Sequence, residues 1–159
     1  MSLPVQRLLL AIAIAGLALV PLVASAFAIT LMNYIGIGAI VSLGLVLLTG
    51  IGGLTSFGQA AFAGIGAYAS AWVSTAMGLS PWIGLVLALI TTGLAALAIG
   101  SITLRLGGHF LPLSTIAWGI AIYSLFANIP GLGQHDGIAN IPPISIGPVS
   151  LAANGAIYY

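Results

Sequence analysis

The polar side chains that could bind a solute are few, and three of them lie within one glycine-rich stretch. Thr55, Ser56 and Gln59 fall inside residues 49–68, TGIGGLTSFGQAAFAGIGAY, between long apolar runs. In hydrocarbon each of these side chains needs a hydrogen-bonding partner, so such groups usually face a bundle interior or a wet cavity. Gln59 either hydrogen-bonds across the glycine-rich stretch or contacts a hydrated pathway.

A second pair of hydroxyls follows a proline further along the chain. Ser114 and Thr115 come directly after Pro112 and Leu113, beside an expected irregularity of the helix. A pathway through the molecule predicts that both polar groups converge on one cavity, whereas pure packing predicts that each polar side chain faces a neighbouring helix singly. On the pathway interpretation, the lining residues are Thr55, Ser56, Gln59, Ser114 and Thr115.

Glycines are concentrated in residues 49–68, the stretch that also contains Thr55, Ser56 and Gln59. Removing side-chain bulk lets a neighbouring helix or a solute approach the backbone closely, and membrane helices pack through such small residues. The stretch could also enter the membrane partly unwound. The glycines that we expect at helix contacts are Gly50, Gly52, Gly53, Gly58, Gly64 and Gly66.

Titratable groups are too few for catalysis. The chain has a single carboxylate, Asp136, and two histidines, His109 and His135, and it has no cysteine. An active site usually needs paired titratable groups within reach of each other, so we expect neither an enzyme nor a cofactor. A two-ligand metal site at His135 and Asp136 is disfavoured, because adjacent residues rarely share a face and polar loop residues are ordinarily solvated.

The composition is that of an integral membrane protein. Hydrophobic residues make up 61% of the 159 and charged residues 2%, against about 25% charged residues in ordinary soluble domains. The net charge of +1 supplies no basic patch for nucleic acid, and the surface is expected to contact membrane lipid.

The apolar runs predict an all-α, polytopic transmembrane bundle in a single domain spanning residues 1–159. About 20 apolar residues cross the hydrocarbon core, and the chain offers roughly five such runs with the glycine-rich segment as a break. The first also resembles a secretory signal peptide, although its length favours a retained helix. The expected spans are 8–28, 31–48, 60–77, 82–104 and 110–129, with Pro81 at the first position of the fourth helix.

The two arginines give an orientation. Arg7 and Arg105 are separated by four expected crossings, an even number that returns the chain to its starting side. The positive-inside preference then places both arginines and the N-terminus in the cytoplasm. The proline-rich stretch 130–150 reads as an irregular extramembrane or interfacial segment, whose Gln134–Asn140 portion is external. Residues 151–159 begin another apolar run that is too short to span.

Three stretches resemble the permease subunits of branched-chain amino acid ABC importers. They are GLVLLTGIGGLTSFGQAAFAGIGAYASA, ITLRLGGHFLPLSTIAWGIAIY and GLGQHDGIANIPPISI, and the distinctive pattern TG-x-x-G-x-x-S-x-G-x-A-A-F-x-G-x-G-A-Y covers residues 49–68. The resemblance extends from about Leu31 onward. It implies a multi-pass channel subunit of the bacterial inner membrane that imports branched-chain amino acids, or in relatives urea or short amides.

The resemblance also implies partners. Such a permease pairs with a second permease subunit, is driven by cytoplasmic ATPase subunits and receives its solute from a periplasmic substrate-binding protein. Family members are about twice as long, so the chain resembles their N-terminal half, as a truncated product, a split subunit or a fragment. The contrasting hypothesis is a non-transporting helical membrane scaffold or assembly protein, in which small residues only pack helices.

Overall fold

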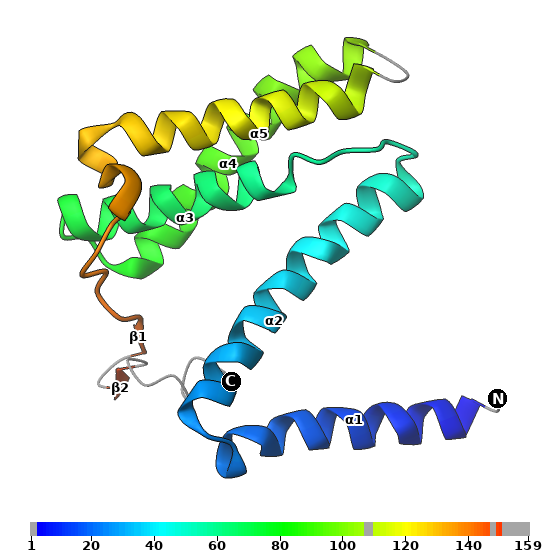
Figure 1. Cartoon of the computed structure of the whole chain (residues 1–159). Coiled ribbons are helices and arrows are strands. Elements are labelled where there is room, and N and C mark those ends of the chain that lie inside the picture. Colours follow the sequence, from blue (N-terminus) through cyan, green and yellow to red (C-terminus); the bar gives the residue numbers. More distant parts are fainter. Residues whose placement is uncertain (1–2, 107–109, 147–148, 151–159) are drawn as a thin grey trace. The chain divides into compact units, whose positions relative to one another are not determined.

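The computed structural model describes residues 3–106, 110–146 and 149–150, which fall into two compact units. The first unit contains helix α1, Leu3–Val23, the part of helix α2 (Ala26–Val46) up to Gly38, and two short strands. Strands β1, Ser145–Ile146, and β2, Val149–Ser150, pair antiparallel. The helices are shown in Figure 1.

The boundary between the first two helices differs from the prediction. We expected the first helix to run through residue 28, but α1 ends at Val23 and α2 begins at Ala26. Ser25 lies between the helices, and its Oγ accepts a hydrogen bond from the Ala28 amide at 3.4 Å. Serine at this position satisfies one of the free N–H groups of a helix start, which a count of apolar residues does not register.

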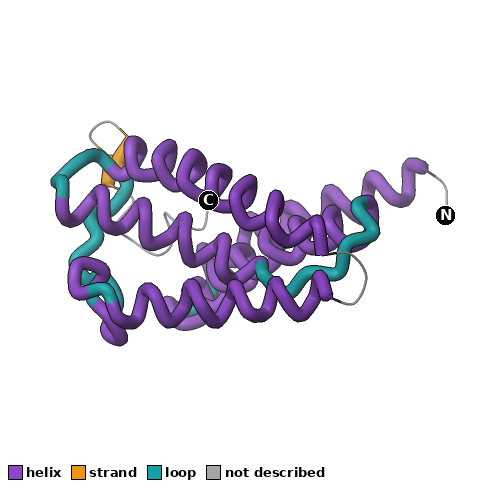
Figure 2. The backbone as a smooth tube through the Cα atoms, turned by 90° about the horizontal axis from the view of Figure 1, so that it is seen from above, coloured by secondary structure: helices purple, strands orange, loops and turns teal. Residues whose placement is uncertain are grey.

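The second unit, residues 39–144, holds the rest of the described helices. The chain leaves α2 through a π-helical turn and then runs without helix or strand from residue 53 to 58, one of the stretches drawn in teal in Figure 2. The elements that follow α2 are η1 Leu47–Ile51, α3 Gln59–Ala76, α4 Pro81–Thr103, η2 Leu104–Leu106, α5 Phe110–Asn128, η3 Pro130–Leu132 and η4 Gln134–Asp136.

The turn between α3 and α4 is built from residues that suit it. Gly78, just beyond the end of α3, has φ +63°, a left-handed conformation that commonly terminates helices. The Ser80 Oγ accepts a hydrogen bond from the Trp82 amide at 3.4 Å. Pro81 lies in the first turn of α4, which confirms its predicted place.

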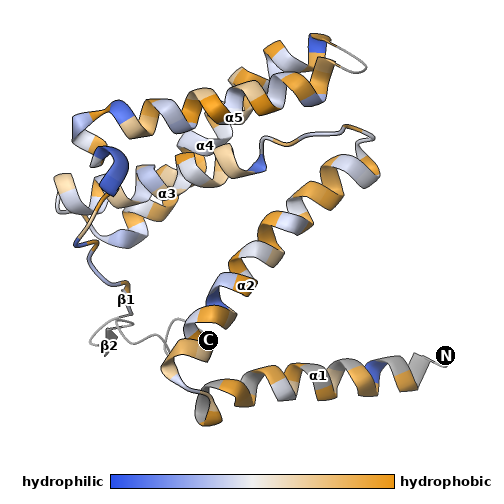
Figure 3. Ribbon diagram, in the orientation of Figure 1, coloured by the Kyte–Doolittle hydropathy of each residue, from blue (hydrophilic) through white to orange (hydrophobic). Residues whose placement is uncertain are grey.

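Among the residues that the structure describes, three helical stretches are long and apolar enough to cross a membrane. They are Ala26–Ile51, Pro81–Leu106 and Phe110–Asn128, and the mostly white-to-orange ribbons of Figure 3 display their apolar character. In α1 the apolar stretch found is Arg7–Leu17, which is shorter than a span. Helix α3 coincides with the expected third span, but its many small and hydroxyl residues lower its hydropathy. Five crossings therefore stay a prediction.

Helix α3 packs along α4 through small residues. A Cβ added to Gly84 would lie 3.0 Å from the Ser70 carbonyl oxygen and 3.0 Å from the Ser74 Oγ. Gly66 approaches α4 as closely, because a Cβ there would lie 3.0 Å from the Thr92 Oγ1. Membrane helices associate through such contacts, since lipid provides no hydrophobic driving force between them.

The segment after α5 covers part of α3. It contains η3 and η4, and four of its residues between 133 and 140 have positive φ. Gly137 of this segment lies near Tyr68 of α3, since a Cβ added to Gly137 would be 3.8 Å from the Tyr68 hydroxyl. The Tyr68 ring in turn stacks on Phe126 of α5, with ring centroids 4.3 Å apart. The predicted turn at His109 and the apolar run 151–159 lie outside the described residues.

Candidate functional site

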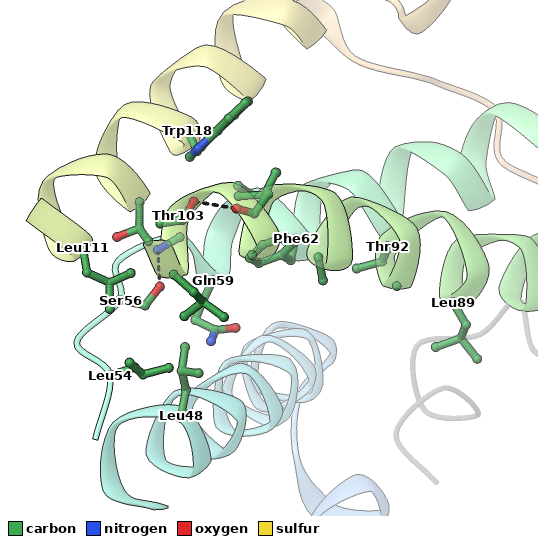
Figure 4. A pocket seen from close by; sticks show the side chains of 18 residues that line it. Leu48, Leu54, Ser56, Gln59, Phe62, Leu89, Thr92, Thr103, Leu111 and Trp118 are labelled. Atoms are coloured by element: carbon green, nitrogen blue, oxygen red, sulfur yellow. Dashed lines mark hydrogen bonds between the residues drawn. The ribbon is translucent and has the colours of Figure 1, made fainter. Parts of the chain in front are cut away.

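A cavity of about 490 Å³ lies within the second unit. Its walls come from the start of η1, the unwound segment, α3, α4, η2 and α5, and Figure 4 shows the side chains around it. The lining residues are mostly apolar, with a few hydroxyl or amide groups and no ionisable side chain among them. They are Leu48, Leu54, Ser56, Gly58, Gln59, Ala61, Phe62, Leu89, Thr92, Gly93, Ala96, Ile99, Gly100, Thr103, Leu104, Leu111, Thr115 and Trp118.

The unwound segment that supplies one wall is set by its glycines. A Cβ on Gly52 would lie 2.5 Å from the Leu48 carbonyl oxygen, which accepts a hydrogen bond from the Leu54 amide at 3.2 Å. Gly53 has φ +63°, a conformation that other residues adopt at a cost. The chain therefore turns out of the π-helical turn at these two positions, and residues 54–58 reach the cavity.

Three of the five predicted pathway residues line this cavity. Ser56 and Thr115 are buried, and Gln59 is half-buried. Thr55 is exposed and lies outside the cavity lining, as expected for neighbours on an extended chain, whose side chains alternate in direction. Ser114 is also absent from the lining, and its Oγ donates to the Leu111 carbonyl oxygen at 2.9 Å.

The polar groups around the cavity differ in how far their hydrogen-bonding capacity is used. The Thr115 Oγ1 donates to the Pro112 carbonyl oxygen at 2.9 Å and accepts from the Phe57 amide at 3.0 Å. The Ser56 Oγ accepts from the Gly58 amide at 3.2 Å. Within the described residues the side-chain amide of Gln59 has no hydrogen-bond partner, and it lines the cavity.

The cavity also contains three polar or aromatic residues that were not predicted from the sequence, Thr92, Thr103 and Trp118. Helical spacing could have indicated them. Thr103 follows Thr92 by eleven residues, which returns to the same face of α4 after about three turns. Trp118 follows Thr115 by three residues and so shares its face of α5.

Thr92 is the unusual hydroxyl of this group. Its Oγ1 is buried and, among the residues that the structure describes, has no hydrogen-bond partner. The neighbouring Thr91 behaves in the ordinary way, donating to the Leu87 carbonyl oxygen of its own helix at 2.8 Å. The Thr92 hydroxyl instead lies against Gly66, where a larger residue would meet it.

The glycines of the stretch serve two purposes. Gly58, Gly64 and Gly66 lie against other elements, since an added Cβ would meet Thr115, Phe126 and Thr92 respectively. For Gly50 and Gly52 the nearest atoms belong to Val46 and Leu48 of the preceding turn, and Gly53 has open space around it. The second group thus shapes the local backbone.

The histidine and carboxylate that were considered as metal ligands do not belong to the cavity lining. His135 and Asp136 are both exposed on η4. Within the part of the chain that the structure describes, no group of three potential ligand side chains could hold a metal ion. His109 lies outside the described residues.

The apolar helices and the cavity define a membrane-embedded helical protein with an internal space of small-molecule size that is lined by apolar and uncharged polar groups. Residues 27–157 match the family model described as branched-chain amino acid transport system / permease component. The chain belongs to this family, which implies that it works with other components of an ABC transporter. No curated protein and no solved structure gives a significant match.

Proposed function

We propose that this chain forms part of the transmembrane pathway of an ATP-driven importer for branched-chain amino acids or related small solutes such as urea and amides. The observation that carries the proposal is the cavity of about 490 Å³, which brings Ser56, Gln59 and Thr115 together among apolar side chains. Its volume lies in the range of about 300–1,000 Å³ that is usual for small-molecule sites. The aliphatic walls would suit the aliphatic side chain of such a solute, and the side-chain amide of Gln59 would suit the polar end of the solute.

The partners follow from the same proposal. A second permease subunit would complete the pathway, cytoplasmic ATPase subunits would drive it, and a periplasmic substrate-binding protein would deliver the solute. A scaffold that only packs helices needs no cavity with polar groups on several of its walls, so the cavity favours transport over that alternative.

The chain would lie in the bacterial inner membrane with its N-terminus and Arg105 in the cytoplasm and with Gln134 outside. Leu106 and Gln134 flank α5, so one crossing separates them. Cysteines introduced singly at these positions should react with an impermeant maleimide from opposite sides. Labelling of both from the same side would contradict a membrane-spanning α5.

The importer proposal is tested by solute uptake. Vesicles carrying the chain together with its permease, ATPase and binding-protein partners should accumulate labelled leucine when ATP is supplied. Omitting the chain or the ATP should abolish uptake, and excess isoleucine should compete, whereas competition by urea or acetamide alone would identify the related solutes. Equal uptake with and without the chain would refute the proposal.

A further inference from the structure

Thr115 connects the unwound segment to α5. Its Oγ1 accepts a hydrogen bond from the Phe57 amide, which is 58 residues away in the chain, at 3.0 Å, and donates to the Pro112 carbonyl oxygen at 2.9 Å. Most hydroxyls in the described helices, such as those of Thr75 and Thr103, donate to a carbonyl one turn back. Thr115 does this and in addition accepts a bond from another part of the chain.

The packing around this bond is close. Gly58 is buried, and a Cβ added to it would lie 3.5 Å from the Thr115 Cβ and 3.6 Å from the Thr115 carbonyl oxygen. The Gly58 amide is itself bonded to the Ser56 Oγ. The end of the unwound segment therefore rests directly on Thr115, in the second turn of α5.

The other backbone hydrogen bonds of the segment run to its own flanks: the Leu54 amide donates to the Leu48 carbonyl oxygen at 3.2 Å, and the Gly58 carbonyl oxygen accepts from the Ala61 amide at 3.1 Å. Residues 53–58 belong to no helix or strand, and the left-handed Gly53 stands at their start. Two of their amides, those of Phe57 and Gly58, are bonded to hydroxyl oxygens. In hydrocarbon a backbone amide that loses such a partner has no water to replace it. The hydrogen bond from the Phe57 amide to Thr115 therefore holds the segment on α5 more firmly than the same bond would in water.

We propose that Thr115 is a positioning residue that clamps residues 53–58 onto α5 and thereby closes one wall of the cavity. Leu54, Ser56 and Gly58 supply that wall, and they move with the segment when the clamp opens. The clamp is a property of the chain itself. Its consequence for transport rests on the proposed function, because opening would admit or release the solute.

Labelling of Ser56→Cys tests the clamp without transport. The chain has no native cysteine, and residue 56 is only 7% exposed, so the thiol should react slowly with maleimide. Thr115→Val keeps the branched shape but removes the acceptor, and it should speed labelling about fivefold, the factor expected for one net hydrogen bond. Thr115→Ser should restore slow labelling. Thr75→Val, which removes a hydroxyl bonded only within its own helix, should leave the rate unchanged.

A cross-link covers the case in which Thr115→Val fails to fold. The 3.5 Å separation of the Gly58 and Thr115 Cβ positions lies within the range of about 3.5–4.5 Å that disulfides require. Gly58→Cys with Thr115→Cys should therefore form an intramolecular disulfide on mild oxidation, as loss of both free thiols shows. Free thiols that persist after oxidation would overturn the proposal.

The outcomes separate the clamp from the importer. Equal labelling rates for a folded Thr115→Val chain and its Ser56→Cys parent would overturn the clamp, even if leucine uptake is observed. Faster labelling that Thr115→Ser reverses would establish the clamp, even if the assembled complex imports no branched-chain amino acid. In the second case only the proposed function fails.

Discussion

Gly84→Ala tests whether α3 and α4 are packed as closely as the structure has them. The added methyl would lie 3.0 Å from the Ser70 carbonyl oxygen and 3.0 Å from the Ser74 Oγ, the two atoms that share a 2.9 Å hydrogen bond. A third contact, with the Ser70 Oγ, is equally short. The helices must therefore separate by a few tenths of an ångström, or the hydrogen bond must be displaced.

The destabilisation caused by Gly84→Ala is best measured as the difference in unfolding free energy between two variants of α4. Inserting a methyl into a filled space costs about 1–3 kcal/mol, while replacing a helical glycine by alanine gains about 1 kcal/mol. Gly93→Ala provides the control, because nothing lies within 4 Å of its added Cβ. The propensity gain is common to both, so the unfolding free energies of the two variants should differ by about 1–3 kcal/mol.

Reversible unfolding in mixed detergent, followed by tryptophan fluorescence, gives these free energies. Gly84→Ala should be less stable than Gly93→Ala, and adding Ser74→Ala to Gly84→Ala should recover part of the loss by removing one of the crowded oxygens. Equal stabilities for the two glycine variants would refute the close α3–α4 contact.

Two further predictions concern the cavity and its wall. Gln59→Leu should change the unfolding free energy by no more than about 0.5 kcal/mol, the usual limit for a side chain without strong interactions. The same substitution should lower leucine uptake by the assembled importer. A loss of stability well above about 0.5 kcal/mol would show instead that the side-chain amide of Gln59 holds the backbone. Gly52→Ala should destabilise the chain by about 1–3 kcal/mol because its Cβ would lie 2.5 Å from the Leu48 carbonyl oxygen. Gly50→Ala, whose nearest neighbour would be 4.0 Å away, should be nearly neutral in the same unfolding assay.

The helices and their turns were predictable because their signals are local. Apolar runs gave the positions of α3, α4 and α5, and Pro81 marked the start of α4. The boundary near Ser25 was mispredicted, because one capping serine is a weak signal inside a long apolar run.

The cavity could be predicted only in part. Ser56, Gln59 and Thr115 were selected as polar groups in apolar surroundings, and all three line it. Thr103 and Trp118 share helix faces with Thr92 and Thr115, but they were missed because a helix that is apolar on all sides does not indicate which face lies inward. Which face lies inward depends on packing between segments that are distant in the sequence.

If the cavity lies on a hydrated solute pathway, cysteines at two adjacent residues of α4 should differ in their accessibility to water-soluble reagents. Ala96 lines the cavity, whereas Leu97 is 72% exposed and is absent from the cavity lining, so we expect it to face lipid. In membranes, Ala96→Cys should react with a charged, water-soluble thiosulfonate and be protected by leucine in the assembled importer, while Leu97→Cys should stay unreactive. An unreactive Ala96→Cys, or equal reaction at both positions, would contradict the pathway.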